Sequence, residues 1–216
     1  MSVITIERKV LEKNDIIANQ NREKFKEKKL FVINIVSSPG SGKTSLIEKT
    51  IELSKGLLKI GVIEGDVQTN IDAERVNKFN VPVVQIVTNG GCHLEANLVK
   101  EAYKKIENED FNLLIIENVG NLVCPSSYDL GEDAKVVILS TTEGDDKPLK
   151  YPAMFRIASV LIINKIDLLP YLDSNIETMK RNALSINPQL KIFETSCKTN
   201  SGLGEWISWL ESNVEK

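Results

Sequence analysis

The segment Ser37–Thr44 constrains the fold more than any other part of this 216-residue chain. The apolar run Leu30–Val36 before it is typical of a buried strand, and the apolar spacing of Ser45–Ile51 after it favours a helix. A strand, a glycine-containing loop that ends in Gly-Lys-Thr, and a helix together form the context of a phosphate-binding loop. In that context the backbone N–H groups of the loop and of the helix N-terminus point at one concavity, which suits an anion.

The residue types in this loop each have a physical role in holding phosphate. Gly40 and Gly42 let the backbone approach phosphate oxygens without a Cβ in the way. Lys43 brings a positive charge near the β- and γ-phosphates, and the Thr44 hydroxyl can bind Mg²⁺. The general pattern begins with glycine where this chain has Ser37, so a plain turn that caps a helix is the alternative; the flanking strand and helix favour the phosphate site. The residues expected to bind nucleotide here are Gly40, Ser41, Gly42, Lys43, Thr44 and Ser45.

The composition is that of an ordinary globular chain and argues against several classes. A formal net charge of -3 and a pI near 5.4 argue against general nucleic-acid binding, which normally requires a basic face. No apolar run approaches the roughly 20 residues that a membrane span needs. The three cysteines show no disulfide-type pattern, and the first residues carry no secretory signal, so we expect a cytoplasmic protein with free thiols.

Strand and helix signals alternate along the chain, which predicts a doubly wound α/β domain with a mostly parallel, seven-stranded sheet and helices on both faces. Residues 30–216 are expected to form this domain, with ligands at the carboxyl ends of its strands. Residues 1–29 predict an amphipathic helical extension packed on the outside. The predicted strands are Leu30–Val36, Ile60–Glu64, Val83–Thr88, Leu113–Glu117, Val136–Ser140, Val160–Asn164 and Lys191–Thr195, and the predicted helices include Leu94–Ile106, Ile176–Ser185 and Leu203–Ser212.

The segment Asn164–Asp167, at the end of a late predicted strand, indicates which base is bound, because it resembles the Asn-Lys-x-Asp element of GTPases. Asp167 can accept hydrogen bonds from N1–H and the exocyclic amine of guanine. Adenine lacks both donors, so a buried carboxylate there can discriminate by about 10⁴–10⁵. Asn164 would hydrogen-bond the base, and the Lys165 stem would cover its face. Alone, this element could be a common turn, but the phosphate loop upstream favours guanine. A later loop that resembles the Ser-Ala-Lys loop of the same enzymes consists of Thr195, Ser196, Cys197 and Lys198.

Two acidic strand ends are available to help Thr44 hold Mg²⁺, which prefers oxygen ligands. Asp66 follows the second predicted strand and is our candidate ligand, directly or through water. Glu117 begins Glu-Asn-Val-Gly, which resembles the Asp-x-x-Gly switch of GTPases. We expect Glu117 to contact the groups that bind Mg²⁺ rather than the ion itself. The Gly120 N–H would then face the γ-phosphate, and Asp72 is a candidate for orienting the attacking water. A helix cap or a solvated turn is the alternative role for each carboxylate. The residues expected to serve catalysis are Lys43, Asp66, Asp72 and Glu117.

The unusual feature of the sequence is the set Cys92, His93 and Cys124. The segment with Cys92 and His93 and the segment with Cys124 each come just after a predicted strand, and His93 is the only histidine in the chain. Two thiolates and an imidazole suit Zn²⁺, or Ni²⁺ in a planar arrangement. Three ligands are too few for a closed structural zinc site, and a two-fold dimer could complete a shared one. The alternative is that the thiols are small buried hydrophobes and the histidine is structural.

These motifs together resemble the HypB family, the GTPases that incorporate nickel during maturation of nickel–iron hydrogenases, in its short archaeal-type form. The resemblance implies a P-loop NTPase of the SIMIBI type that binds GTP/GDP and forms a homodimer in the GTP state. The matching stretches are Ser37–Thr44, Glu64–Thr69, Gly90–Ala96, Glu117–Pro125, Glu143–Pro152 and Asn164–Asp167.

The resemblance further implies that Cys92, His93 and Cys124 are interfacial ligands for nickel or zinc, and that Lys150 reaches the guanine bound in the other subunit. Partners would be the nickel chaperone HypA and the hydrogenase large subunit. Residues 1–29 contain no cysteine or histidine, so a separate nickel-storage motif is not expected.

Three other functions fit parts of the sequence. The related urease nickel-insertion GTPases pair a phosphate loop with a Cys-Pro-His order, whereas this chain has Cys92-His93. A P-loop kinase would need an acceptor pocket, and the sequence has no obvious lid arginines. A nucleotide-gated metal-binding module without turnover is the third alternative.

Overall fold

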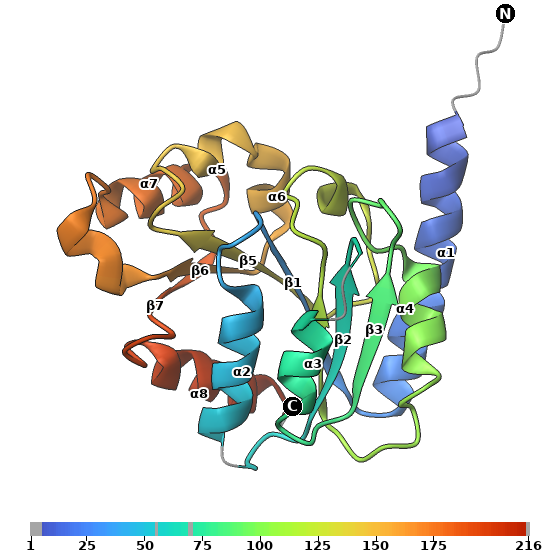
Figure 1. The fold of residues 1–216 in the computed structure, drawn as a ribbon. Coiled ribbons are helices and arrows are strands. Elements are labelled where there is room, and N and C mark those ends of the chain that lie inside the picture. Colours follow the sequence, from blue (N-terminus) through green and yellow to red (C-terminus); the bar gives the residue numbers. More distant parts are fainter. Residues whose placement is uncertain (1–5, 55, 69–70, 215–216) are drawn as a thin grey trace, which may run out of the picture.

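Among the residues that the computed structural model describes, 6–54, 56–68 and 71–214, seven strands form one sheet in the order β3-β2-β4-β1-β5-β6-β7 (Figure 1). Every neighbouring pair is parallel. The sheet is therefore wholly parallel rather than mostly so, and the predicted fold class is confirmed. The strands are β1 Phe31–Ser37, β2 Ile60–Asp66, β3 Val83–Val87, β4 Leu113–Glu117, β5 Ala134–Ser140, β6 Val160–Asn164 and β7 Lys191–Thr195.

Helices cover both faces of the sheet (Figure 1). Alternate strand residues face opposite sides, and both sides carry apolar side chains that the helices bury. Ile33 and Ile35 of β1 pack with α2 and α8 in one core cluster, whereas Val32 packs with α4 on the other face. The central strands β4, β5 and β6 are buried along their whole length, as a parallel sheet covered on both sides requires. The helices are α1 Ile6–Glu27, α2 Lys43–Ser54, α3 Ile71–Asn77, α4 Ala96–Tyr103, α5 Lys147–Lys150, α6 Pro152–Ile157, α7 Ile176–Ile186 and α8 Leu203–Val214, with 3₁₀ turns η1 Cys124–Ser127 and η2 Ile166–Tyr171.

Helix α4 begins two residues later and ends three residues earlier than the predicted Leu94–Ile106. The backbone N–H of Leu94 donates to the Asn118 side chain at 3.1 Å, and Glu95 is extended at the helix N-cap. A contact with a distant part of the chain therefore holds the first two residues out of the helix, which the local sequence pattern could not reveal.

Helix α1 lies against α4 (Figure 1), and two buried asparagines fasten it there. Asn21 Nδ2 donates to the carbonyl oxygens of Ala96 and Leu130, at 2.9 and 3.0 Å. Asn14 Oδ1 accepts the N–H of Ala96, the first residue of α4, at 2.8 Å. These bonds fit a helix packed on the outside of the sheet. The division into residues 1–29 and 30–216 stays a prediction, and residues 1–5 lie outside the described part of the chain.

No helix in the described part of the chain is both long enough and apolar enough to cross a membrane.

We expect Asn21→Ala to lower the free energy of unfolding by about 1–3 kcal/mol, because two buried carbonyls lose their donor. Chemical denaturation measures this change. The matched control is Asn19→Ala, on the exposed side of the same helix, which we expect to change stability by less than about 0.5 kcal/mol. Equal effects of the two substitutions would contradict the anchoring role of Asn21.

Candidate functional site

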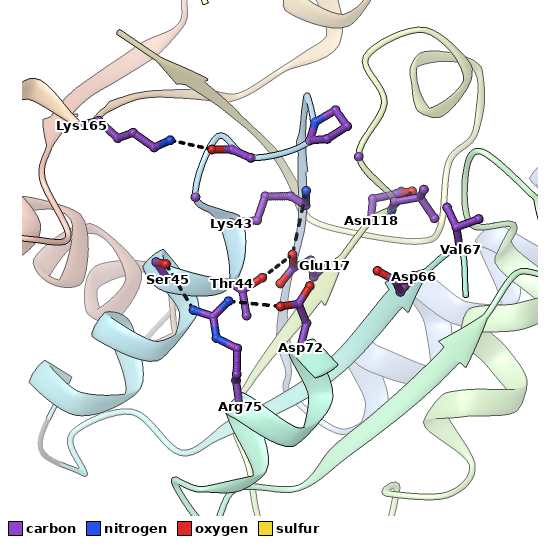
Figure 2. Close-up of a pocket in the computed structure, with 16 residues that line it drawn as sticks. Lys43, Thr44, Ser45, Asp66, Val67, Asp72, Arg75, Glu117, Asn118 and Lys165 are labelled. Carbon is purple, nitrogen blue, oxygen red and sulfur yellow. Dashed lines mark hydrogen bonds and ion pairs between the residues drawn. The ribbon is translucent and has the colours of Figure 1, made fainter. Parts of the chain in front are cut away.

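A cavity of about 460 Å³ lies where the loop after β1 meets the carboxyl ends of β2 and β4 (Figure 2). Gly40 and Gly42 of this loop have φ angles of +75° and +103°, which favour glycine. A Cβ at Gly42 would also lie 2.5 Å from Nδ2 of Asn164, so the loop and the segment after β6 are in close contact. Among the residues lining the cavity are Gly40, Gly42, Lys43, Thr44, Ser45, Asp66, Asp72, Glu117 and Gly120.

Glu117, at the end of β4, contacts both functional side chains of the loop (Figure 2). Its Oε1 accepts the Thr44 hydroxyl at 3.0 Å and lies 3.9 Å from the Lys43 ammonium. The same ammonium donates to Ser37 Oγ at 3.2 Å. Ser37 ends β1 as its last residue and so supplies a hydroxyl partner to the lysine at the place where glycine is usual. Lys43, Thr44 and Glu117 thus meet in one buried cluster, and their predicted roles in binding phosphate and Mg²⁺ stay predictions.

Glu64 is a residue whose importance the sequence analysis missed. It is paired in register with Glu117 across β2 and β4, and the two are only 1% and 3% exposed. Burial, reinforced by the neighbouring carboxyl group of Glu117, raises the pKa of Glu64 to about 11, and burial also raises the pKa of Glu117. Within the described part of the chain, Glu64 Oε1 and Glu117 Oε2 have no hydrogen-bond partner. Unpartnered carboxylate oxygens beside a hydroxyl fit a divalent cation such as Mg²⁺.

The predicted carboxylates Asp66 and Asp72 both line this cavity, and the structure adds an arginine. Asp66 Oδ1 accepts the N–H of Gln68 at 2.8 Å. Asp72 Oδ1 accepts from Arg75 Nη1 at 3.1 Å, and Arg75 also donates to Ser45 Oγ at 3.3 Å (Figure 2). Asp72 is therefore held by Arg75 in this structure. Nothing in the sequence distinguishes Arg75 from other helical arginines, so local reasoning had no signal for it.

A second cavity of about 430 Å³ adjoins the first and shares Gly42, Ser45 and Lys165 with it. Its lining includes Asn164, Asp167, Cys197 and Lys198, so both predicted base-binding segments meet there. Ser196 Oγ donates to Asp167 Oδ1 at 2.5 Å, which fixes that carboxylate between the two segments.

Asn164 and Lys165 tie this second cavity to the phosphate loop. Asn164 Nδ2 donates to the Ser41 carbonyl at 3.0 Å, and its Oδ1 accepts from Thr195 Oγ1 at 3.2 Å. Lys165 Nζ donates to the Gly40 carbonyl at 2.6 Å. Asn164 is 1% exposed, so in this state it acts as a brace between loops, and its predicted bond to the base stays a prediction. Burial raises the pKa of the Cys197 thiol in the same cavity to about 11.

Lys150 lines neither of these two cavities. Its ammonium is exposed on α5 and pairs with Asp146 at 2.7 Å. This position leaves the side chain accessible from outside the subunit, and its predicted contact with a nucleotide in a second subunit stays a prediction.

Cys92, His93 and Cys124 come together as the sequence led us to expect. Their ligand atoms all lie within 4.8 Å of one another, with the two Sγ atoms 2.9 Å apart and Cys92 Sγ 3.6 Å from His93 Nδ1. The His93 ring lies on Tyr128 with ring centroids 3.9 Å apart, and burial lowers the pKa of His93. Asn121 Nδ2 donates to the Cys92 carbonyl at 3.2 Å and joins the two segments. Two sulfur atoms and one imidazole nitrogen in this space suit a transition metal.

The segment between the nucleotide cavity and Cys124 touches the phosphate loop directly. A Cβ at Gly120 would lie 2.9 Å from Pro39 Cγ and 3.1 Å from its Cα and N. Only glycine permits this approach, so Gly120 lies against the phosphate loop, where the predicted switch would have to be.

The family described as CobW/HypB/UreG, nucleotide-binding domain, matches residues 31–194. The fold and the loop at Ser37–Thr44 accordingly define a nucleotide-binding domain of the SIMIBI type of P-loop NTPase. A hydrogenase maturation factor HypB of Azotobacter chroococcum is 51% identical over 209 residues, which are 97% of this chain and 68% of the relative. The chain belongs to the HypB family of hydrogenase maturation factors.

Two crystal structures of family members resemble nearly the whole chain. HypB from Helicobacter pylori in complex with nickel is 41% identical, with a TM-score of 0.90, and the match covers 94% of this chain and 95% of that one. HypB from Archaeoglobus fulgidus is 43% identical, with a TM-score of 0.88 and coverage of 94% and 99%. These matches confirm the family predicted from the sequence.

The Glu64 carboxyl makes stability depend on pH. Its folded pKa of about 11 lies above the unfolded value, so the contribution of Glu64 to the stability of the nucleotide-free protein is fully present below the unfolded pKa and is lost as pH rises towards the folded one. One such group lowers stability by at most about 1.4 kcal/mol per pH unit. We expect Glu64→Gln, which mimics the protonated form, to lose less stability than the unmodified protein between about pH 5 and 8.

Denaturation with a chelator present and no nucleotide measures this pH dependence. Glu205→Gln, at an exposed position, is the matched control and should follow the unmodified protein. Parallel profiles for Glu64→Gln and the unmodified protein would show that Glu64 does not retain a proton.

Proposed function

We propose that the chain is a GTP-hydrolysing metallochaperone that carries nickel, or zinc, at Cys92, His93 and Cys124 and assists nickel insertion into nickel–iron hydrogenase. The observation that carries the proposal is the short segment from Glu117 to Cys124. One end contacts the phosphate loop, and the other ends in a cluster whose ligand atoms lie within 4.8 Å of one another. Nucleotide and metal cargo are thereby linked by eight residues of backbone.

Guanine is the proposed base because Asp167 lies in the cavity beside the phosphate loop with its carboxylate held by Ser196. In the proposed complex Asp167 accepts from N1–H and the exocyclic amine, and the stem of Lys165 covers the base. Lys198 lines the same cavity. This arrangement favours GTP over ATP for the reason given above, since adenine would leave the carboxylate unpaired.

Hydrolysis is proposed to use the residues around Glu117. Thr44 and Asp66 would hold Mg²⁺, which neutralises phosphate charge when bound, and Glu117 orients the Thr44 hydroxyl. Lys43 stabilises negative charge on the phosphates, and the Gly120 N–H faces the γ-phosphate. Asp72, held by Arg75, is the proposed residue for positioning water. Turnover of GTP by the purified protein separates this proposal from a metal-binding module that only binds nucleotide.

The cargo site is proposed to be completed at a homodimer interface in the GTP state. Three ligands from one chain leave a fourth position open, and Cys92 lies at the surface where a second copy can approach. Nickel is present in the similar H. pylori structure. Lys150, exposed on α5, is proposed to reach the partner's guanine. By family membership the proposed partners are HypA and the hydrogenase large subunit, in the cytoplasm, with residues 1–29 as an extension on the domain.

We expect Asp167→Asn to lower affinity for GTP by about 10- to 100-fold, because a buried donor pair loses its acceptor. The amide of the new side chain can donate to the second carbonyl of xanthine, so the variant should prefer xanthosine triphosphate. Competition binding with both nucleotides measures this exchange. Asp173→Asn, at an exposed position outside both cavities, is the matched control. An unchanged preference for GTP in Asp167→Asn would remove this residue from the base site.

We expect Cys92→Ala and Cys124→Ala each to weaken nickel binding at least about tenfold. Loss of a residue that only hydrogen-bonds to a metal ligand already lowers metal affinity by about that factor, and these substitutions remove a ligand itself. Equilibrium nickel titration measures the effect. Cys197→Ala removes the remaining cysteine and should retain nickel affinity, since that thiol lies in the base cavity. Undiminished affinity in both Cys92→Ala and Cys124→Ala would refute the cargo site.

A further inference from the structure

Asn118 is a buried residue that lines the nucleotide cavity (Figure 2). It directly follows Glu117, which accepts the hydroxyl of Thr44. The Asn118 side chain points away from bulk water, with its Oδ1 accepting the N–H of Leu94 at 3.1 Å and its Nδ2 donating to Asn34 Oδ1 at 3.2 Å. Leu94 is the neighbour of His93, so the Asn118 amide joins the end of β4 to the segment that holds Cys92 and His93.

From Asn34 the hydrogen bonds continue across β1 to the second metal-ligand segment. Asn34 is fully buried, and its Nδ2 donates to Glu132 Oε1 at 3.1 Å. The same carboxylate oxygen lies 3.3 Å from the ammonium of Lys135, and the two side chains are only 6% and 8% exposed. Lys135 lies beside Asn34 in the register of β1 and β5, which explains why the charged pair meets this amide.

Lys135 ends the series of bonds at the backbone that follows Cys124. Its ammonium donates to the carbonyl oxygens of Pro125 and Tyr128, at 3.1 and 3.0 Å. Pro125 is the residue next to Cys124, and Tyr128 carries the ring on which His93 lies. Because the buried Lys135 ammonium donates to two carbonyl oxygens of the loop after Cys124, it fixes the position of that loop.

We propose that Asn34, Asn118, Glu132 and Lys135 form a polar relay that positions the two halves of the metal cluster and transmits the nucleotide state to it. Lys135 is the positioning residue for the Cys124 segment, and Asn118 is the positioning residue for the Cys92–His93 segment. The inference rests on the proposed function, since it takes the cluster to bind nickel.

The physical basis is that a buried polar network specifies one arrangement when its members are satisfied by each other. The relay begins at the residue after Glu117, and Gly120 two residues later touches Pro39 of the phosphate loop. A shift of this backbone on nucleotide exchange therefore moves the Asn118 amide, and both metal-ligand segments are bonded to the same series. A network that served only to join strands would have no reason to end on backbone groups of both ligand segments, namely the N–H of Leu94 and the carbonyl oxygens of Pro125 and Tyr128.

The test is nickel titration of Lys135→Met in the full chain, with GDP and with a slowly hydrolysed GTP analogue. Methionine keeps the aliphatic stem and removes the donor, so the Cys124 segment loses its anchor. We expect nickel affinity to fall about 10- to 100-fold, as for other partners that orient metal ligands. The thiolate-to-nickel absorption band should also shift, which a purely structural role would not cause. Lys59→Met, at an exposed lysine, is the matched control and should bind nickel normally.

Lys135 lies outside the nucleotide cavity, so the affinity of Lys135→Met for GDP should stay within about twofold of normal. We also expect the difference in nickel affinity between the GDP and GTP-analogue states to shrink in this variant. If the unmodified protein binds nickel with the same affinity in the presence of GDP and of the GTP analogue, the proposed transmission of the nucleotide state is overturned.

Glu132→Gln is a milder variant that covers the case in which Lys135→Met does not fold. Glutamine offers one acceptor oxygen, whereas the Glu132 carboxylate now accepts from Asn34 through Oε1 and from the N–H of Leu130 through Oε2. One of these bonds must be lost, so nickel affinity should fall by a smaller factor than for Lys135→Met. Nickel binding unchanged in both folded variants overturns the relay.

Cys124→Ala, measured alongside, keeps the two proposals distinguishable. If Cys124→Ala loses nickel affinity while Lys135→Met and Glu132→Gln do not, only the relay fails. If Cys124→Ala retains nickel affinity, the cargo site itself fails and the relay fails with it.

Discussion

The hydrogen bond from the Thr44 hydroxyl to Glu117 is the contact on which the rest of this structure depends. It joins the phosphate loop to β4 at the carboxyl edge of the sheet, beside the buried carboxyl group of Glu64. Parallel register puts these two carboxyl groups side by side, and their burial raises both pKa values, since charge at this depth is costly. The Mg²⁺ that we propose at this edge would favour the ionised form of both carboxyl groups.

The chain after Glu117 uses one stretch of backbone for two kinds of chemistry. Asn118 bonds to the neighbour of His93, Gly120 packs on the phosphate loop, and Cys124 ends the stretch in the proposed metal site. Because no flexible linker separates these contacts, a change at either end has a short mechanical route to the other. The chain belongs to the HypB family of hydrogenase maturation factors, and coupling of nucleotide to nickel cargo is the use that we propose for this route.

Much of the fold could be predicted from the sequence because apolar runs mark strands that are covered on both sides, and all seven were found in the described part of the chain. The closeness of Cys92 and Cys124 also followed from strand ends meeting at one edge. The start of α4 was wrong because a tertiary bond at Leu94 decides it. The importance of Glu64 depended on strand register, and that of Arg75 on packing between helices, and neither leaves a local pattern.

The exposure of Cys92 has a kinetic consequence. A metal enclosed on all sides can leave only when the protein opens, so its release is as slow as local unfolding. Here Cys92, one of the proposed sulfur ligands, lies at the surface, while the His93 ring lies against Tyr128. A donor atom of a receiving protein could approach from the solvent side and form its bond before the last bond of the carrier breaks. Delivery by ligand exchange would then require no hydrated free ion as an intermediate.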